Sequence, residues 1–195
     1  MWLETHDSTT TIIWTVKSRP FVTLLFKIDN RYEAIIDKNG RLLRANKTID
    51  QKNIRQQWTI DYSRKISRAT SNRNYNWPIT ADCRHILSML YDLRERTLTP
   101  GESLHYILDV ESQIWQLDGN VRPIHDQAGN FQAYEIVFHF SPALDIKQRA
   151  WKTDLLTNRL ARKDSQLTIR LGRQRRPLLI RFGGDDGIVE MKLRN

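Results

Sequence analysis

The feature that most constrains the fold of this 195-residue chain is a succession of short segments rich in β-branched and aromatic residues, separated by turn signals. Residues 9–16, TTTIIWTV, and 131–140, FQAYEIVFHF, are typical strands. Asn39-Gly40 favours a tight hairpin turn. The polar stretch 63–76 predicts one edge strand and a loop. Further strands are predicted at 21–28, 31–37, 41–49, 54–62, 103–110, 113–118, 166–171, 178–182 and 188–193.

One segment has a helical rather than an alternating pattern. Within residues 82–96, apolar side chains recur at the spacing of one helical face. Asp82 or Thr80 supplies an N-cap, and Pro100-Gly101 stops the chain soon after the helix ends. We therefore predict a single, mainly β domain over 1–195: a curved antiparallel sheet or incomplete barrel of about ten strands with one packed α-helix.

Positive charge is concentrated at the C-terminal end of the chain. Of the formal net charge of +9, residues 147–195 contribute +8, with 13 Lys and Arg against 5 Asp and Glu. Residues 146–165 are predicted to form a basic helical or mobile excursion. The asymmetry suggests an anionic partner, and the alternative is a solvated basic surface.

The basic stretch LGRQRRPLLIRFGG, residues 171–184, is interpreted first as part of a hairpin. Pairing 167–171 with 178–182 places Leu171 opposite Leu178, Ile169 opposite Ile180 and Leu167 opposite Phe182, which creates one apolar face. The same register keeps every arginine opposite a residue other than arginine. Candidate anion contacts at this end of the sheet are Arg170, Arg173, Arg175, Arg176 and Arg181.

Four elements resemble, in order, a bacterial cell-envelope family known only as a domain of unknown function. They are KIDNRYEAIID (27–37), DCRHILSMLYDLR (82–94), LTPGE (98–102) and the closing strands with LTIRL, RRPLLI and Gly187-Ile188-Val189. The resemblance implies an antiparallel β protein exported to the periplasm or cell envelope, with no established activity. It also implies a curved sheet similar to the half-barrels of lipoprotein carriers. No site residue is implied.

The supplied sequence has no signal peptide, so either the protein is cytosolic or a signal has been removed. No apolar run is long enough to span a bilayer as a helix. The single cysteine, Cys83, forms no intramolecular disulfide and is expected to be a small buried side chain. The oligomeric state is not predicted.

Motifs of the common hydrolases, zinc proteases and P-loop enzymes are absent from the sequence. We predict no catalytic residue, no metal site and no cofactor, and a binding protein rather than an enzyme. His105, Asp109 and Glu111 share one face of a predicted strand by parity and would suit a metal. A solvated strand face is the preferred interpretation of these three residues.

Aromatic residues on several predicted strands form the candidate ligand pocket. On one concave face they would line a site for an acyl chain or another apolar ligand, and otherwise they fill the core. They are Trp14, Phe21, Phe26, Trp58, Trp115 and Phe138. We predict a hydrophobic or amphipathic ligand such as a lipid, or a partner protein, with an anionic surface near the basic end. Nucleic-acid or anionic-polymer binding through the C-terminal quarter is the alternative, which few interleaved aromatics support.

Overall fold

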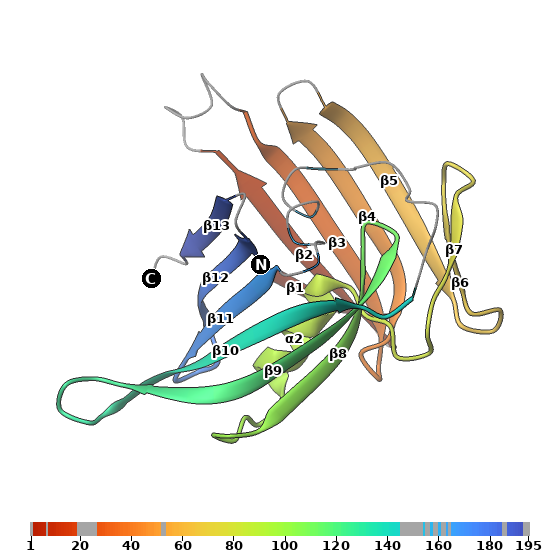
Figure 1. The fold of residues 1–195 in the computed structure, drawn as a ribbon. Helices are drawn as coiled ribbons and strands as arrows, with labels where there is room; N and C mark the ends of the chain where they lie inside the picture. The colour runs from red at the N-terminus through yellow and green to blue at the C-terminus, as the bar shows by residue number, and fades with distance from the viewer. Residues whose placement is uncertain are drawn as a thin grey trace.

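The computed structural model describes residues 2–6, 8–18, 27–51, 54–144, 154, 157, 160, 163, 165–184 and 187–192. These residues are mainly β, and their strands form two antiparallel sheets around helix α2, Ile86–Glu95 (Figure 1). No pair of strands among the described residues joins one sheet to the other, so the sheets do not close into a barrel. The fold class predicted from the sequence is confirmed.

Both sheets are meanders in which each strand pairs with the next strand in the chain. The seven strands of the first sheet are β1 (Trp2–His6), β2 (Thr9–Lys17), β3 (Asp29–Asp37), β4 (Leu42–Gln51), β5 (Ile54–Ser63), β6 (Arg68–Ser71) and β7 (Asn76–Pro78). The six strands of the second are β8 (Ser103–Val110), β9 (Gln113–His125), β10 (Phe131–Pro142), β11 (Gln166–Gly172), β12 (Pro177–Gly184) and β13 (Gly187–Lys192). The polar stretch 63–76 thus forms parts of two short strands rather than one. The predicted segments 21–28 and 146–165 lie mostly outside the described residues.

The Asn39-Gly40 turn forms as predicted. Gly40 has a φ of +72°, a conformation that costs glycine little. Asp37 Oδ1 accepts the backbone N–H groups of Asn39 and Arg41, both at 2.9 Å. The local sequence therefore determines this turn, and the turn sets the pairing of β3 with β4.

The basic stretch forms the predicted hairpin with one correction. Leu167 pairs with Phe182 and Ile169 with Ile180, as expected. A register shift after Arg170 places Leu171 opposite Pro177 instead of Leu178. Leu178 consequently leaves the apolar face and is 37% exposed. A bulge changes which side of the strand a residue faces, and parity in the sequence does not reveal it.

Helix α2 is shorter than the predicted 82–96, and the reason is a backbone bridge to the second sheet. Arg84 N donates to Ile107 O at 2.8 Å, and Asp109 N donates to Arg84 O at 2.9 Å. Residue 84 is therefore extended, and His85, rather than Asp82 or Thr80, is the N-cap. Its Nδ1 accepts the N–H of Leu87 at 3.3 Å.

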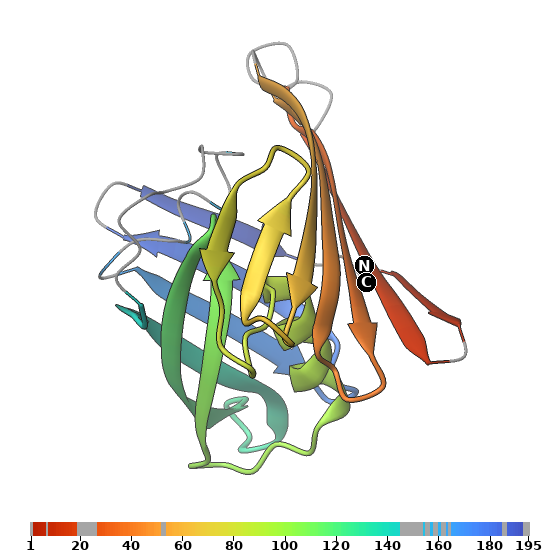
Figure 2. The ribbon, with the colours of Figure 1, turned by 90° about the vertical axis from the view of Figure 1, so that its right-hand side faces the viewer.

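The chain crosses from the first sheet to the second through residues 79–102, which include α2 (Figure 2). The helix lies in the space between the two sheets and packs against β2, β3 and β8. The buried side chains of α2 belong to the same hydrophobic core as the inward-facing residues of both sheets. The space between the helix and the two sheets is therefore the part of the fold in which a buried ligand site would be expected.

Gly119 provides a test of the packing in the second sheet. It pairs with Phe138, whose fully buried ring covers it, and an added Cβ would lie 2.6 Å from Phe138 Cδ1. We expect Gly119→Ala to lower the free energy of unfolding by about 1–3 kcal/mol, because the buried ring has no free space to enter. Urea denaturation measures this change.

Gly172→Ala is the matched control, because the nearest atoms are the ends of the exposed Leu178 side chain, which can rotate away. Its effect should stay within about 0.5 kcal/mol. Equal effects of the two substitutions would contradict the packing of Phe138 on Gly119.

Candidate functional site

The site is built around the face of α2 that the sequence pattern identifies as apolar. Ile86, Leu87, Leu90 and Leu93 are buried. Three of these, Ile86, Leu87 and Leu90, line a cavity of about 30 Å³ between the helix and the sheets. A cavity of this size holds about two water molecules.

Both sheets contribute to the walls of this cavity. Trp14 and Tyr32 come from the first sheet, and Leu167, Ile180 and Phe182 come from the second. Apart from the hydroxyl groups of Tyr32 and Thr157, the lining side chains are hydrocarbon, indole or thioether groups. None of the polar atoms of these side chains is exposed to the cavity, which is therefore suited to apolar atoms.

Tyr32 and Thr157 connect the cavity to a buried polar cluster. Asn30 Nδ2 donates to Tyr32 Oη at 2.7 Å, and both residues are buried. Burial and the nearby charge of Asp154 raise the pKa of Tyr32, so the phenol keeps its proton. Thr157 Oγ1 donates to Asp154 Oδ2 at 2.6 Å and is also hydrogen-bonded to Glu111 Oε1.

A buried ion pair lies at the centre of this cluster. Lys47 Nζ is 2.8 Å from Glu111 Oε1, and the two side chains are only 4% and 7% exposed. Burial works to lower the pKa of Lys47, but the charges of Glu111 and Asp154 outweigh it and raise that pKa. Lys47 is therefore protonated within the protein, and its charge needs its acidic neighbours.

Local geometry brings Glu111 inward. Glu111 and Ser112 form the two-residue turn between β8 and β9, with φ values of 55° and 62°. Non-glycine residues adopt this left-handed conformation at some cost in free energy. The ion pair with Lys47 compensates for the strain at Glu111.

Two more buried titratable groups lie near Lys47. Burial and the charge of Lys47 lower the pKa of His85 to about 3, so its imidazole is neutral. Burial raises the pKa of Asp109 to about 6, against the hydrogen bonds that Oδ2 accepts from Tyr62 and Trp77, both at 2.9 Å.

The expected solvated strand face at His105, Asp109 and Glu111 is wrong for two of its three members. His105 is exposed and bonds to Asp118 at 2.8 Å, whereas Asp109 and Glu111 are buried in separate contacts. Strand parity fails because Glu111 belongs to the turn and because β5 and β7 cover Asp109. The described residues include no group of three His, Cys, Asp or Glu side chains arranged to hold a metal.

The structure does not bring the four described pocket aromatics together. Trp14 lines the cavity, and Phe21 and Phe26 lie outside the described residues. Trp58 is buried elsewhere in the first sheet, with Arg73 stacked 4.5 Å from its ring centroid.

The last two pocket aromatics belong to the core of the second sheet. Trp115 packs edge-on against Phe140, and Phe138 packs edge-on against Tyr106. The cavity lining instead includes aliphatic residues of α2, β11 and β12 that the search for aromatics did not select.

Three of the five predicted anion contacts bond to the protein itself. Arg170 pairs with Glu135 at 2.7 Å, and Arg173 donates to Phe131 O at 3.1 and 3.2 Å. Arg175 donates to Glu95 O and Arg96 O, at 2.7 and 2.6 Å, at the C-terminal end of α2.

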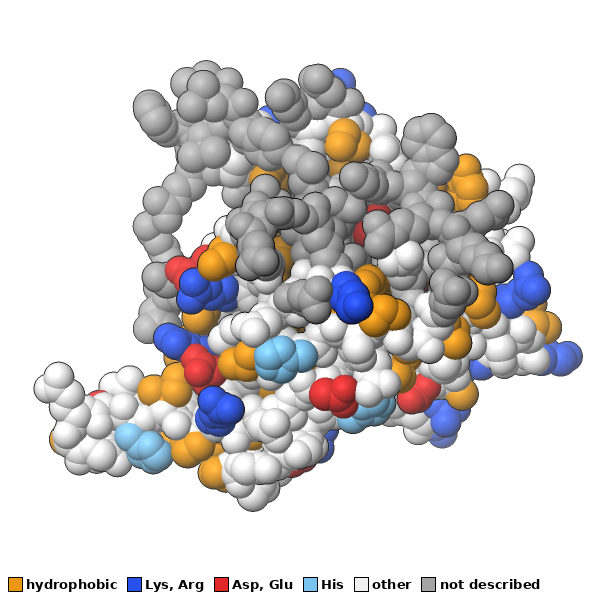
Figure 3. Space-filling view, viewed as in Figure 1, with side chains coloured by type: hydrophobic (Ala, Val, Ile, Leu, Met, Phe, Trp, Pro, Cys, Tyr) orange, Lys and Arg blue, Asp and Glu red, His pale blue; other side chains and the backbone are white. Residues whose placement is uncertain are grey.

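Arg176 and Arg181 are exposed. On the face seen in Figure 3, Lys and Arg side chains are dispersed among acidic and apolar ones.

Sequence reasoning missed the buried polar cluster, although one signal was present. Ala45, Lys47, Ile49 and Gln51 alternate along β4 and share its buried side. A lysine between two apolar residues of a core-facing series indicates a buried cation that needs a partner. The identity of that partner, 64 residues later in the chain, has no local signal.

Comparisons with known proteins return no match to any family model, curated protein or solved structure. Among the described residues, no helix is both long and apolar enough to cross a membrane.

Breaking the buried ion pair should destabilise the fold strongly. We expect Lys47→Met to lower the free energy of unfolding by about 3–5 kcal/mol, because Glu111 would be left buried without its cation. The control is Lys27→Met, which removes a lysine just before β3 that pairs with Asp50 but is 41% exposed. Its loss should be about 0–1 kcal/mol in the same urea titration. Similar losses for both variants would show that Lys47 is not in a buried pair.

The buried neutral imidazole of His85 should make the stability of the folded protein sensitive to acid. Its pKa in the folded protein, about 3, lies below the ordinary value of 6.5, so the unfolded chain binds a proton that the folded protein excludes. The contribution of neutral His85 to the free energy of unfolding is therefore fully present above about pH 6.5 and is lost as the pH falls toward 3. Asp109 acts in the opposite direction, since its raised pKa favours the folded state as it becomes protonated.

His85→Asn keeps an N-cap acceptor and removes the ionisation. From about pH 7.5 to about pH 4.5, the wild type should lose about 3 kcal/mol more stability than this variant. Asp109 is present in both proteins and does not affect the difference. The exposed His139→Asn control should behave as the wild type does. If His85→Asn also follows the wild-type curve, the acid sensitivity comes from other groups.

Proposed function

We propose that this protein is a non-enzymatic binding protein of the cell envelope that takes a hydrophobic or amphipathic ligand between its two sheets. The observation that carries the proposal is the cavity beside α2, whose walls come from the helix and from both sheets and are apolar except at Tyr32 and Thr157. An apolar chain placed there would be removed from water on all sides. The envelope location rests on the sequence resemblance alone.

The size of the cavity determines how such a ligand would enter. Sites for lipid-sized molecules commonly have volumes of about 300–1,000 Å³, whereas this cavity has about 30 Å³. A ligand would therefore have to separate the helix from one of the sheets. Leu90, on the buried face of α2, would then change its neighbours on binding.

Tyr32 and Thr157 connect the lining of the cavity to Asp154 and Glu111. Their hydroxyl groups are not exposed to the cavity, which presents only apolar surface. The cavity would therefore take the hydrocarbon part of a ligand, and the head group of an amphipathic ligand would lie outside it.

Fluorescence titration with N-phenyl-1-naphthylamine, followed by displacement with palmitate and with palmitoyl-lysophosphatidylcholine, tests the proposal. We expect saturable binding that both competitors reverse. Leu90→Trp fills the cavity and should weaken binding about tenfold or more. Leu43→Trp, at a position that is 39% exposed, is the control and should bind as the wild type does.

A second variant keeps the test decisive if Leu90→Trp does not fold. Met191→Ala enlarges the cavity from the edge strand β13 and should strengthen binding relative to the wild type and to Leu43→Trp. Circular dichroism and urea denaturation establish that each variant is folded. Absence of saturable binding, or equal affinity for all three variants, would overturn the proposed function.

A further inference from the structure

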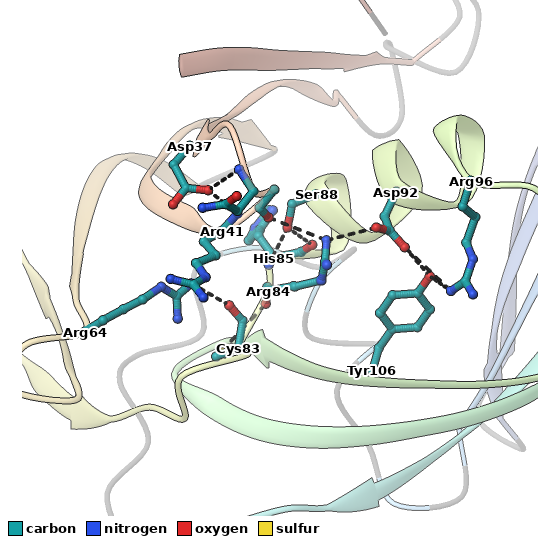
Figure 4. A network of polar contacts seen from close by, with 12 residues as sticks. Asp37, Arg41, Arg64, Cys83, Arg84, His85, Ser88, Asp92, Arg96 and Tyr106 are labelled. Carbon is teal, nitrogen blue, oxygen red and sulfur yellow. Dashed lines mark hydrogen bonds and ion pairs between the residues drawn. The ribbon is translucent and has the colours of Figure 1, made fainter. Parts of the chain in front are cut away.

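A second hollow, of about 220 Å³, lies beside the segment that leads into α2, where three stretches of chain meet. The β3–β4 turn contributes Arg41, the residue after β5 is Arg64, and the segment before α2 contributes Arg84 (Figure 4). Asp82 is the acidic residue that lines it. We call this hollow the arginine groove.

Arg64 is held in place by backbone carbonyl groups. Its guanidinium bonds to the carbonyl oxygens of Ala81 and Cys83, the latter at 3.2 Å, and more weakly to those of Leu42 and Thr80 at 3.5 and 3.4 Å. Its Nε is buried and has no hydrogen-bond partner. No ion pair joins Arg64 to a carboxylate among the described residues, although the charges of Asp37 and Asp82 act on its guanidinium from nearby.

Arg84 is also oriented before any ligand arrives. Its Nη1 is 3.4 Å from Asp92 Oδ1 and 3.5 Å from Gly40 O, and its guanidinium lies over the Tyr106 ring at 5.8 Å. A Cβ at Gly40 would lie 3.2 Å from Arg84 Nη1, so the glycine permits the close approach. Preorganised donors lose less entropy on binding a ligand.

Arg41 is the arginine of the groove whose side chain is exposed to solvent. The nearby Asp37 uses Oδ1 to accept two backbone N–H groups of the turn. Burial lowers the pKa of Arg64, and the positive charge of Arg41 lowers that pKa further. Arg41 and Arg64 also line the same groove, so the two cations lie close to one another. Like charges held together without a bound anion are unfavourable, and an anion between them would relieve the repulsion.

We propose that the arginine groove binds a phosphate group. Arg41 and Arg84 offer N–H donors that match the oxygens of phosphate. The guanidinium of Arg64, whose own N–H groups bond to backbone carbonyls, adds positive charge beside them. The groove is independent of the apolar cavity and of the C-terminal arginines. The source of the phosphate is either a free phosphate compound or a lipid head group, because both present the same oxygens.

Isothermal titration calorimetry with inorganic phosphate at low ionic strength tests whether the groove binds a free phosphate compound. We expect saturable binding that Arg41→Gln weakens about tenfold, the effect of losing one charge-assisted hydrogen bond. Asp82→Asn should strengthen binding, because it removes the repelling carboxylate. Arg55→Gln is the matched control, since Arg55 is 82% exposed and lies at the opposite end of β5.

Flotation with vesicles of phosphatidic acid, compared with phosphatidylcholine vesicles, tests the lipid source with the same variants. Binding to phosphatidic acid that is lost in Arg41→Gln and kept in Arg55→Gln would assign the groove to a head group. Phosphate binding with the same pattern would assign it to a free compound.

Two results would overturn the proposal. One is no binding in either experiment, and the other is binding that Arg41→Gln and Arg55→Gln reduce equally, which would indicate general surface charge. Thermal unfolding of each variant, compared with the wild type, confirms that the protein is folded.

Discussion

The burial of α2 between the two sheets is the contact on which the remaining structure depends. Each sheet is a meander with one apolar face, and an isolated sheet of this kind cannot remove that face from water. Six of the ten residues of α2 are buried, so the helix supplies apolar surface to the interior on more than one side. The bridge between Arg84 and β8 fixes where the helix begins and therefore which of its residues face the cavity.

The same interior contains charged groups that a purely structural core would not need. Lys47 remains protonated in a region where isolated charges are costly, and a strained turn brings Glu111 into contact with it. Tyr32 and Thr157 extend this network to the cavity wall. The cavity itself presents only apolar surface, and this apolar lining from the helix and both sheets is the physical basis of the proposed function.

The part of the sequence that is richest in basic residues is not the part that supplies the converging arginine side chains of the groove. Arg170, Arg173 and Arg175 belong to the basic C-terminal quarter, yet each bonds to a carboxylate or carbonyl group of the protein. Arg41, Arg64 and Arg84 come from the nearly neutral part of the chain and line one groove. Net charge is a property of composition, whereas an anion site requires guanidinium groups that converge in space.

Elements whose causes are local could be predicted from the order of the residues. Alternation predicted most strands, Asn39-Gly40 predicted its turn, and the apolar spacing predicted α2 to within a few residues. Ile169 opposite Ile180 followed from parity alone. Only the tertiary structure decided the bulge at Leu171, the start of α2 at Ile86 and the partners of Lys47 and Arg64. These features depend on contacts between residues far apart in the chain, and periodicity over neighbouring residues contains no information about such contacts.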